Sequence, residues 1–422
     1  MVNQRKIALN ALIAVGEDLG YSNIVLKKAL GSADVTDNDK PFITTLFYGV
    51  LDRLITLDYI ILRFTKKPLK RITPITLNAL RLAIFQLMYL DKVPQSAAVN
   101  ESVKLVKNSK ESYNTAFANA VLREFLRNRP ELPTDNSVTS LKIRYSCPEW
   151  IIESFIKDYG IDETVILLEH FMTAPKITLR VNTRVADVDG VISSLESFGV
   201  AVSKGSVPDS LILDSGADIG SLDIYKNGSV YAQDIPSQTA VMKLQLSNTD
   251  RLLDMCASPG GKSFTAAQYV TDGEIVSCDI YENRVNLIIS GEKRLNIGNI
   301  TGIVCDSSKF NRNLGEFDAV ICDVPCSGLG VIRRKPEIKY KKDLDFDSLA
   351  DTQRNILDNA ANYLKVNGKI LYSTCTLRKA ENEEMVLSFL NRHSDFKLLF
   401  EHTFLPSTDG TDGFYYAVLK RG

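Results

Sequence analysis

The chain has 422 residues, of which 45% are hydrophobic and 24% are charged, and its formal net charge is -1. This length exceeds that of one typical domain, so we expect two or three domains, each with its own core. The near-neutral charge excludes a protein coated with positive charge, so any nucleic-acid site must be a local basic patch.

Neither a membrane span nor a secretory signal is predicted. No segment has the roughly 18 uncharged apolar residues that cross a bilayer, and residues 1–10 lack a basic head followed by an apolar block. The seven cysteines do not form a small disulfide framework, which indicates a reducing cytoplasm. With three histidines and no Cys-x-x-Cys pair, no metal site is expected.

Residues 1–130 show helical periodicity and predict an all-α bundle. Capping side chains at Asp37–Asp39 and a proline at Pro41 suit the start of one long amphipathic helix. The apolar face of that helix comprises Phe42, Leu46, Val50, Leu54 and Leu57. A second helix begins at Thr73-Pro74 and is expected to be central and buried. The remaining helices are expected at Pro94–Val106 and Tyr113–Leu126.

A basic cluster lies between two of these predicted helices. It comprises Arg63, Lys66, Lys67, Lys70 and Arg71, and no acid occurs between Ile61 and Arg81. A solvated loop face and a contact with RNA phosphates explain the cluster equally well, so the choice between them stays open.

A polar, Pro-rich stretch at Pro130–Ser137 predicts a linker that ends the first domain, 1–130. A small α+β domain is expected over residues 137–235, and a third domain over residues 236–422. The helices of the small domain are expected at Leu141–Tyr159 and Val188–Phe198, and its strands at Lys176–Asn182, Leu211–Leu213 and Gly228–Ala232.

From Arg251 onward, strand patterns alternate with helical patterns, which is typical of a doubly wound parallel sheet. The strands are expected at Leu252–Met255, Glu274–Cys278, Ile300–Cys305, Asp318–Cys322, Lys369–Ser373 and Phe414–Leu419. The helices between them are expected at Tyr281–Leu295, Ser348–Leu364 and Glu381–Arg392. In such a sheet, ligands bind beyond the carboxyl ends of the strands.

The first of these strands leads into a glycine-rich turn, Cys256–Gly261, that is suited to a bound cofactor. A dinucleotide fold requires a Gly-x-Gly-x-x-Gly pattern, which this turn lacks. A phosphate-binding P-loop fits Gly261-Lys262-Ser263, but its first glycine would fall at Cys256. Both nucleotide interpretations are therefore weakened.

Four aspartates follow apolar runs and are expected on one rim of the sheet. They are Asp254, Asp279, Asp306 and Asp323. Any one of them alone also suits a helix cap, but four on one rim indicate a polar ligand with hydroxyl and amine groups. Asp279, at the end of the second strand, occupies the position of a ribose-binding acid.

Two cysteines, Cys326 and Cys375, fall just beyond strand ends on the same rim, where a thiolate can attack an electrophilic ring carbon. The other cysteines in this region are expected to be inert packing residues, as free cysteines usually are. They are Cys256, Cys278, Cys305 and Cys322.

Four motifs resemble the signatures of RNA cytosine-5 methyltransferases, and their order and spacing are most similar to the RsmB family, also called Sun or Fmu. The motifs are Asp254–Lys262, Asp323–Pro336, Ser373–Cys375 and Glu381–Glu383. Gly49–Arg53 resembles the NusB antitermination protein, and Gln233-Asp234 resembles a further family motif but suits a plain turn equally well. The resemblance implies a Rossmann-like α/β methyltransferase sheet, preceded by a small α+β RNA-binding domain and an all-α NusB-like bundle.

The resemblance also implies roles for individual residues. S-adenosylmethionine would be held by Asp254, Cys256, Ala257, Ser258, Pro259, Gly260, Gly261, Lys262, Asp279, Arg284, Asp306 and Asp323. Cys375 would be the nucleophile and Cys326 would assist product release, while Asp323 and Lys262 would contact the target base. A basic run follows the first cysteine motif and comprises Arg333, Arg334, Lys335, Lys339, Lys341 and Lys342. A solvated loop is the alternative, but at the mouth of a pocket for an RNA base, contacts with RNA phosphates are favoured, above all at Arg333, Arg334 and Lys335.

The implied substrate is 16S rRNA, either naked or in an early assembly particle, and the protein is expected to be a cytoplasmic monomer. Carbon 5 of cytosine is a poor nucleophile, so Cys375 would add at carbon 6 of an unstacked base to activate it. Another RNA, such as tRNA or 23S rRNA, is an alternative substrate. A DNA methyltransferase would use Cys326 as its nucleophile, and a non-catalytic assembly factor would show a degraded rim. Cys375 and the intact acids argue against these last two.

Overall fold

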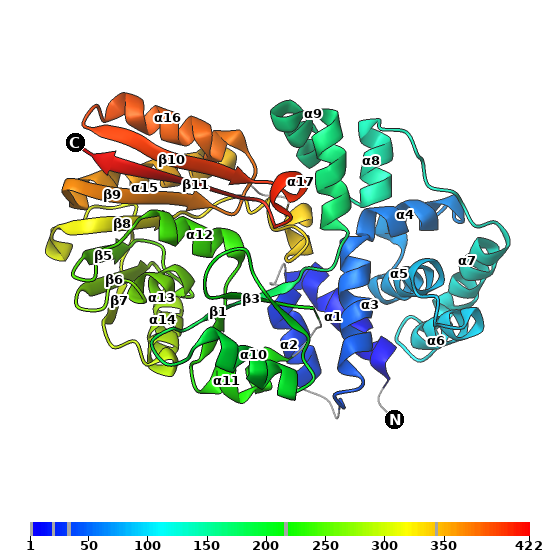
Figure 1. Ribbon diagram of the computed structural model, residues 1–422. Coiled ribbons are helices and arrows are strands. Elements are labelled where there is room, and N and C mark those ends of the chain that lie inside the picture. Colours follow the sequence, from blue (N-terminus) through cyan, green and yellow to red (C-terminus); the bar gives the residue numbers. More distant parts are fainter. Residues whose placement is uncertain (1–2, 19–21, 32–34, 215–217, 342–344) are drawn as a thin grey trace. The chain divides into compact units, whose positions relative to one another are not determined.

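The computed structural model describes residues 3–18, 22–31, 35–214, 218–341 and 345–422 (Figure 1). These residues form two compact units. The helical unit contains Met1–Thr173 and Ile332–Asp343, and the α/β unit contains Ala174–Val331 and Leu344–Gly422. The helical unit is therefore built from two separate stretches of the chain. None of the helices in the described ranges combines the length and apolar character that a membrane span needs.

Helix α5 is the centre of the helical unit. The helices of this unit are α1 (Gln4–Asp18), α2 (Ser22–Gly31), α3 (Lys40–Asp52), α4 (Leu54–Arg63), α5 (Pro74–Tyr89), α6 (Gln95–Lys107), α7 (Thr115–Arg127), α8 (Val138–Tyr145) and α9 (Glu149–Phe171). α5 packs against α1, α3, α4, α6 and α7, and Leu80, Ala83 and Ile84 are fully buried in the resulting core. The expectation of a central buried helix is confirmed.

The single long amphipathic helix expected in this unit is wrong, because the chain breaks between α3 and α4. Arg53 has a non-helical backbone (φ -119°, ψ 21°), and its guanidinium lies over the ring of Tyr89, 4.6 Å from the centroid. The apolar face stays buried across the break, at Leu46, Val50 and Leu57. The apolar spacing therefore continues through Arg53 and gives no sign that the helix ends.

The helix expected at Leu141–Tyr159 is also broken, and its two parts are α8 and α9. Ser146 ends α8 in the left-handed conformation (φ 51°), and Gly160 (φ 80°) interrupts α9. Both helices lie in the helical unit. The domain boundaries drawn from the sequence stay predictions, since the helical unit continues beyond the linker.

The second stretch of the helical unit carries the short helix η5 (Pro336–Tyr340). Lys339 is only 3% exposed, and its Nζ donates to the backbone oxygen of Asp52 at 2.7 Å. Glu337 accepts hydrogen bonds from the backbone N–H and the Oγ of Ser22, at 3.3 and 2.7 Å. Residues far apart in sequence thus hold η5 within the helical unit.

The expectation that the whole basic run contacts phosphates is wrong for Lys339, because its ammonium group is buried. Burial lowers the pKa of Lys339, although the nearby Asp52 opposes this shift. Burial also raises the pKa of the Asp52 carboxyl to about 6. Lys342 lies outside the described residues.

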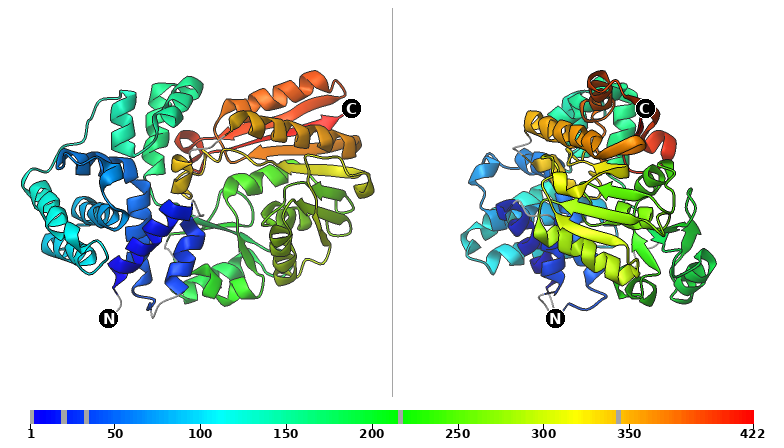
Figure 2. Two further views of the ribbon diagram at one scale, coloured as in Figure 1. Left: turned by 180° about the vertical axis from the view of Figure 1, so that it is seen from behind. Right: turned by 90° about the vertical axis from the view of Figure 1, so that its left-hand side faces the viewer.

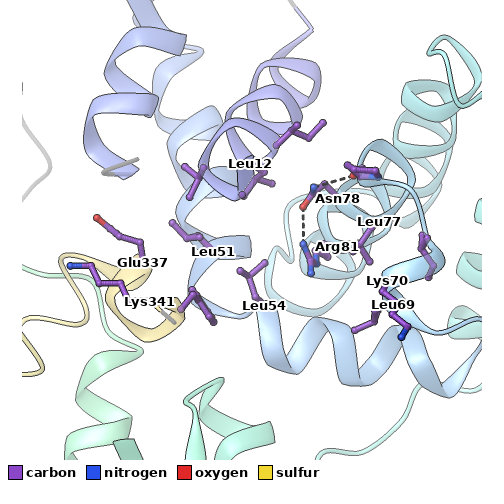
Figure 3. Close-up of a pocket in the computed structure, with 16 residues that line it drawn as sticks. Leu12, Leu51, Leu54, Leu69, Lys70, Leu77, Asn78, Arg81, Glu337 and Lys341 are labelled. Atoms are coloured by element: carbon purple, nitrogen blue, oxygen red, sulfur yellow. Dashed lines mark hydrogen bonds between the residues drawn. The ribbon is translucent and has the colours of Figure 1, made fainter. Parts of the chain in front are cut away.

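A pocket of about 650 Å³ lies within the helical unit, between α1, α3, α5 and the η5 segment (Figure 3). Its wall is mainly aliphatic, and Tyr340 contributes to it. Two of its polar side chains are already paired, because Arg81 donates to Asn78 at 3.0 Å and contacts Asp58 at 2.7 Å. The pocket contains none of the residues predicted to bind the cofactor or the target base.

The α/β unit begins with a four-stranded antiparallel sheet in the order β2-β3-β1-β4. Its elements are β1 (Ile177–Val181), α10 (Val188–Ser197), β2 (Val202–Lys204), β3 (Ser210–Leu213), α11 (Asp223–Lys226) and β4 (Val230–Ala232). Arg180 on β1 is buried and donates to Gln238 and Gln268 at 3.2 and 3.0 Å. These bonds attach the small sheet to the rest of the α/β unit.

A seven-stranded sheet follows, in the order β10-β11-β9-β8-β5-β6-β7. Its strands are β5 (Arg251–Asp254), β6 (Glu274–Asp279), β7 (Ile300–Val304), β8 (Phe317–Asp323), β9 (Leu364–Thr374), β10 (Phe396–Phe404) and β11 (Phe414–Arg421). The strands from β9 to β7 are parallel, whereas β11 and β10 are antiparallel. The expected Rossmann-like sheet is confirmed. The sequence did not predict β10, an edge strand whose exposed residues do not alternate with buried ones.

Helices cover both faces of this sheet (Figure 2). They are α12 (Ile235–Lys243), α13 (Gly261–Ala267), α14 (Glu282–Leu295), α15 (Phe346–Tyr363) and α16 (Glu383–Arg392). Leu252 and Ile275 pack on the face covered by α12, α13 and α14, and Leu253 and Val276 pack on the face covered by α15 and α16. Consecutive strand residues thus enter opposite cores, which explains why these strands are continuously apolar.

Candidate active site

The parallel strands bring the predicted acids to one rim of the large sheet. Asp254, Asp279 and Asp323 are the last residues of β5, β6 and β8, and these strands are neighbours in the order β8-β5-β6. Asp306 follows the end of β7, the next strand in the sheet. Sequence position alone therefore located this edge correctly, because all four strands run in the same direction.

Asp254 is fully buried where β5 enters the glycine-rich turn. Its Oδ2 accepts a hydrogen bond from Ser263 Oγ at 2.7 Å, but its Oδ1 has no partner within the structure. Burial raises the pKa of Asp254 to about 7. An unpaired buried carboxylate oxygen is costly unless a ligand satisfies it, and the ammonium group of S-adenosylmethionine has the donor that fits.

The turn after Asp254 leaves no room for a side chain at Gly260. Gly260 has φ +110°, and a Cβ there would lie 2.3 Å from the ring of Phe264. The remaining turn residues, Cys256, Ala257, Ser258, Pro259 and Gly261, connect β5 to α13. Only glycine satisfies both the positive φ and the close contact with Phe264.

Asp279 and Asp306 present carboxylates in two different environments. Asp279 is 6% exposed, accepts the backbone N–H of Tyr281 at 3.1 Å and lies 3.9 Å from Arg284. Asp306 pairs with Lys309 at 2.9 Å, and the hydrogen bond from Ser308, followed by that from Lys309, lowers the pKa of Asp306. The ribose-binding role of Asp279 stays a prediction, whereas Asp306 already has partners on its own loop.

Lys262 and Asp323 form an ion pair at the rim, with 2.7 Å between Nζ and Oδ2. Ser373 Oγ donates to the other oxygen of Asp323 at 2.8 Å. Burial alone would lower the pKa of Lys262, but the charge of Asp323 and its hydrogen bond outweigh burial and raise it. The Lys262 ammonium thus stays protonated, and it fixes the Asp323 carboxylate in place.

The two predicted catalytic cysteines meet, with 3.3 Å between the sulfurs of Cys326 and Cys375. The hydrogen bond with Cys375, together with burial, raises the pKa of Cys326 well above its usual value. The assignment of Cys375 as the nucleophile stays a prediction, and the contact between the two sulfurs shows that both thiols lie at one place on the rim. Cys278 and Cys322 are buried in the sheet, as expected of packing residues.

The predicted phosphate contacts belong to the helical unit. Arg333 NH1 donates to Thr173 Oγ1 at 3.3 Å, Arg334 is half-buried, and Lys335 is exposed. Their role in binding RNA stays a prediction.

Two polar residues beside the site had no role assigned from the sequence. Ser373 precedes the Thr374-Cys375 pair and orients Asp323. Gln233 accepts from Thr265 Oγ1 at 2.6 Å, and its buried Nε2 has no partner within the structure. In the sequence, Ser373 is marked only by its position near Cys375. Gln233 is marked only by the Gln233-Asp234 pair.

Known proteins match the whole chain. The family model described as 16S rRNA methyltransferase RsmB/F matches residues 241–420, the NusB family matches residues 2–127, and a ferredoxin-like domain of RsmF/B-like methyltransferases matches residues 147–220. The probable ribosomal RNA small subunit methyltransferase B of Bacillus subtilis is 33% identical over 99% of this chain and 98% of its own length. Ribosomal RNA small subunit methyltransferase B of Escherichia coli K12 is 30% identical over 91% of each chain.

Solved structures share this fold. The crystal structure of PH0851 superposes with a TM-score of 0.86 and 26% identity, covering 100% of this chain and 99% of its own. NSun6 from Pyrococcus horikoshii with SFG has a TM-score of 0.60 at 21% identity, covering 65% of this chain and 98% of its own. The second likeness concerns the fold alone.

Proposed function

The chain belongs to the RsmB/F family of 16S rRNA methyltransferases, which use S-adenosylmethionine, and on this premise we propose that it methylates carbon 5 of a cytosine through a covalent adduct with Cys375. The contact of 3.3 Å between Cys326 and Cys375 carries the proposal. We further propose, from the family resemblance alone, that the target is cytosine 967 of 16S rRNA. The enzyme is proposed to act as a monomer in the cytoplasm, on naked rRNA or an early assembly particle.

The first chemical step forms a bond between Cys375 Sγ and carbon 6 of the cytosine, and the electron pair of the ring double bond moves to carbon 5. Asp323 lies at the rim to hydrogen-bond ring nitrogen 3 and stabilise the adduct. S-adenosylmethionine supplies the electrophilic methyl group when bound. Lys262 holds Asp323 in this position through their 2.7 Å ion pair.

The second step restores the ring. The proton on carbon 5 passes to a base, for which the Cys326 sulfur is the candidate, and the electron pair of the broken carbon–hydrogen bond forms the double bond between carbons 5 and 6 again. The bond between carbon 6 and Cys375 Sγ breaks, and its electron pair leaves with the sulfur. Cys326 is placed to assist this elimination because its sulfur lies beside that of Cys375. The Cys375 thiolate is regenerated, so the cysteine is not consumed.

The test incubates the full-length protein with labelled S-adenosylmethionine and deproteinised 16S rRNA and then identifies the labelled nucleoside. We expect 5-methylcytidine at one position. Label in tRNA or 23S rRNA alone would move the substrate to another RNA. The absence of label with a folded protein and competent RNA would favour a binding factor over an enzyme.

Cofactor affinity is expected to depend on pH through Asp254. Its carboxyl has a pKa of about 7 in the free protein, and only the ionised form pairs with the ammonium group of the cofactor. Affinity should therefore be constant above pH 7 and fall by up to about tenfold for each pH unit below it. Calorimetric titration at several pH values measures this slope.

The control for this prediction is Asp254→Asn, which should bind the cofactor weakly at every pH. Because burial raises the pKa of Asp254 in the folded protein, protonated Asp254 contributes to the free energy of unfolding of the cofactor-free protein at low pH. This contribution is lost as the pH rises through 7. The free energy of unfolding of Asp254→Asn should not show this decrease with pH. An unchanged slope in Asp254→Asn would assign the pH dependence to another group.

A further inference from the structure

The proposed chemical steps use no residue of the motif Glu381-Asn382-Glu383. Glu381 ends the short helix η6 (Lys379–Glu381), and Glu383 begins α16. Glu381 is 3% exposed and Asn382 is fully buried. A buried carboxylate next to a buried amide requires partners, and their partners lie on both cysteine loops.

The Glu381 carboxylate holds the loop that carries Cys326. The residue after this cysteine, Ser327, donates its backbone N–H to Glu381 Oε2 at 2.9 Å and its Oγ to Oε1 at 2.7 Å. Gln353 Nε2 donates both to Glu381 at 3.0 Å and to the backbone oxygen of Pro325 at 2.9 Å. The residues on either side of Cys326 are thus fixed through one carboxylate.

Asn382 holds the other cysteine loop in the same manner. Its Oδ1 accepts from Thr374 Oγ1 at 2.6 Å, and its Nδ2 donates to the backbone oxygen of Thr376 at 3.0 Å. These are the two residues that flank Cys375. A hydrogen bond of 2.7 Å between Ser327 Oγ and Thr376 Oγ1 joins the loops directly.

Glu381 also acts on the cysteines by its charge. After the hydrogen bond with Cys375, burial and the charge of Cys375, the negative charge of Glu381 further raises the pKa of Cys326. Arg378 offsets this charge only in part, since its NH1 lies 3.3 Å from Glu381. A carboxylate at this place disfavours a thiolate on Cys326.

We propose that Glu381 and Asn382 are positioning residues that clamp the two cysteine loops together and thereby set which of the two thiols reacts first. This inference rests on the proposed function and explains how that function distinguishes two adjacent thiols. Neither residue touches the cofactor rim acids among the hydrogen bonds of the described residues. Both act through Ser327, Thr374 and Thr376.

The test measures which cysteine reacts, without RNA. The full-length protein is alkylated with iodoacetamide over a range of pH, and the modified fractions of Cys326 and Cys375 are quantified by mass spectrometry. In the wild type, Cys375 should react first. In Glu381→Gln, which removes the charge and one acceptor, the preference for Cys375 should fall at least about fivefold, and the pH at which Cys326 reacts should decrease.

Glu383→Gln is the matched control. It is the neighbouring carboxylate of the same motif, but it accepts from Thr403 Oγ1 at 2.7 Å and makes no hydrogen bond with either cysteine loop. Its alkylation preference and its kcat should equal those of the wild type. In Glu381→Gln, kcat for methyl transfer should fall about ten- to a hundredfold with unchanged cofactor affinity.

Ser327→Ala provides a milder variant if Glu381→Gln does not fold. Ser327→Ala keeps the charge and loses one donor, so it should lower kcat less than Glu381→Gln. A folded Glu381→Gln that retains both wild-type selectivity and wild-type kcat would overturn the clamp. A wild type that makes no 5-methylcytidine would overturn the proposed function instead, and the alkylation experiment would still judge the clamp.

Discussion

Cys375→Ala is expected to lower methyl transfer to RNA by at least about a thousandfold, because it removes the sulfur that is proposed to form the bond to carbon 6. Cofactor affinity should stay within about twofold of the wild-type value, since Asp254 and the glycine-rich turn are unchanged. Single-turnover transfer of labelled methyl measures the first quantity, and calorimetry the second.

Cys326→Ala is the paired variant, and its expected result differs in kind. The adduct between Cys375 and the base should form, but its release should slow, so a protein–RNA complex should persist on a denaturing gel. Cys375→Ala should give no such complex. If transfer persists in Cys375→Ala and is lost only in Cys326→Ala, the two cysteines have the opposite roles.

Lys262→Met is expected to lower kcat by on the order of a hundred- to a thousandfold, because it removes the group that orients Asp323. It should also lower the free energy of unfolding by about 2 kcal/mol. That figure is below the usual loss for a fully buried pair because the Asp323 side chain is 34% exposed. Kinetics and chemical denaturation measure the two effects.

A second substitution separates stability from catalysis at this pair. Lys262→Met with Asp323→Asn removes both charges, so most of the lost stability should return while kcat stays low. The control is Lys365→Met, which breaks a more exposed ion pair with Asp318 at 2.8 Å and should cost less than about 1 kcal/mol. Recovery of kcat in the double variant would contradict an orienting role for Lys262.

The rim was predictable because each of its acids ends an apolar strand, and parallel strands end on the same side. The hydrogen bonds that organise the rim were not predictable from the sequence. Glu381 is hydrogen-bonded to Ser327 although 54 positions separate them in the sequence. The periodicity of apolar residues does not indicate such a pair. The motif was visible in the sequence, but its purpose depends on which loops the fold places beside it.

Two predictions for the helical unit are wrong for a related reason. Arg53 breaks a helix whose apolar spacing continues without interruption, and its guanidinium lies over the ring of Tyr89, a tertiary contact that the spacing does not indicate. Lys339 was grouped with exposed cations because a basic run is usually solvated. Its buried ammonium group donates to the backbone oxygen of Asp52. Because the two residues are far apart in the sequence, this contact could not be predicted from it.

The division of the helical unit into two stretches has a consequence for biosynthesis. Lys339 and Asp52 are separated by 287 positions, and Glu337 and Ser22 by 315. A nascent chain can therefore form the N-terminal helices early, but it completes their core only after the ribosome has synthesised η5. Until then, the surface that will receive Tyr340 is exposed, and such surfaces recruit chaperones. An isolated N-terminal fragment would retain this exposed surface permanently.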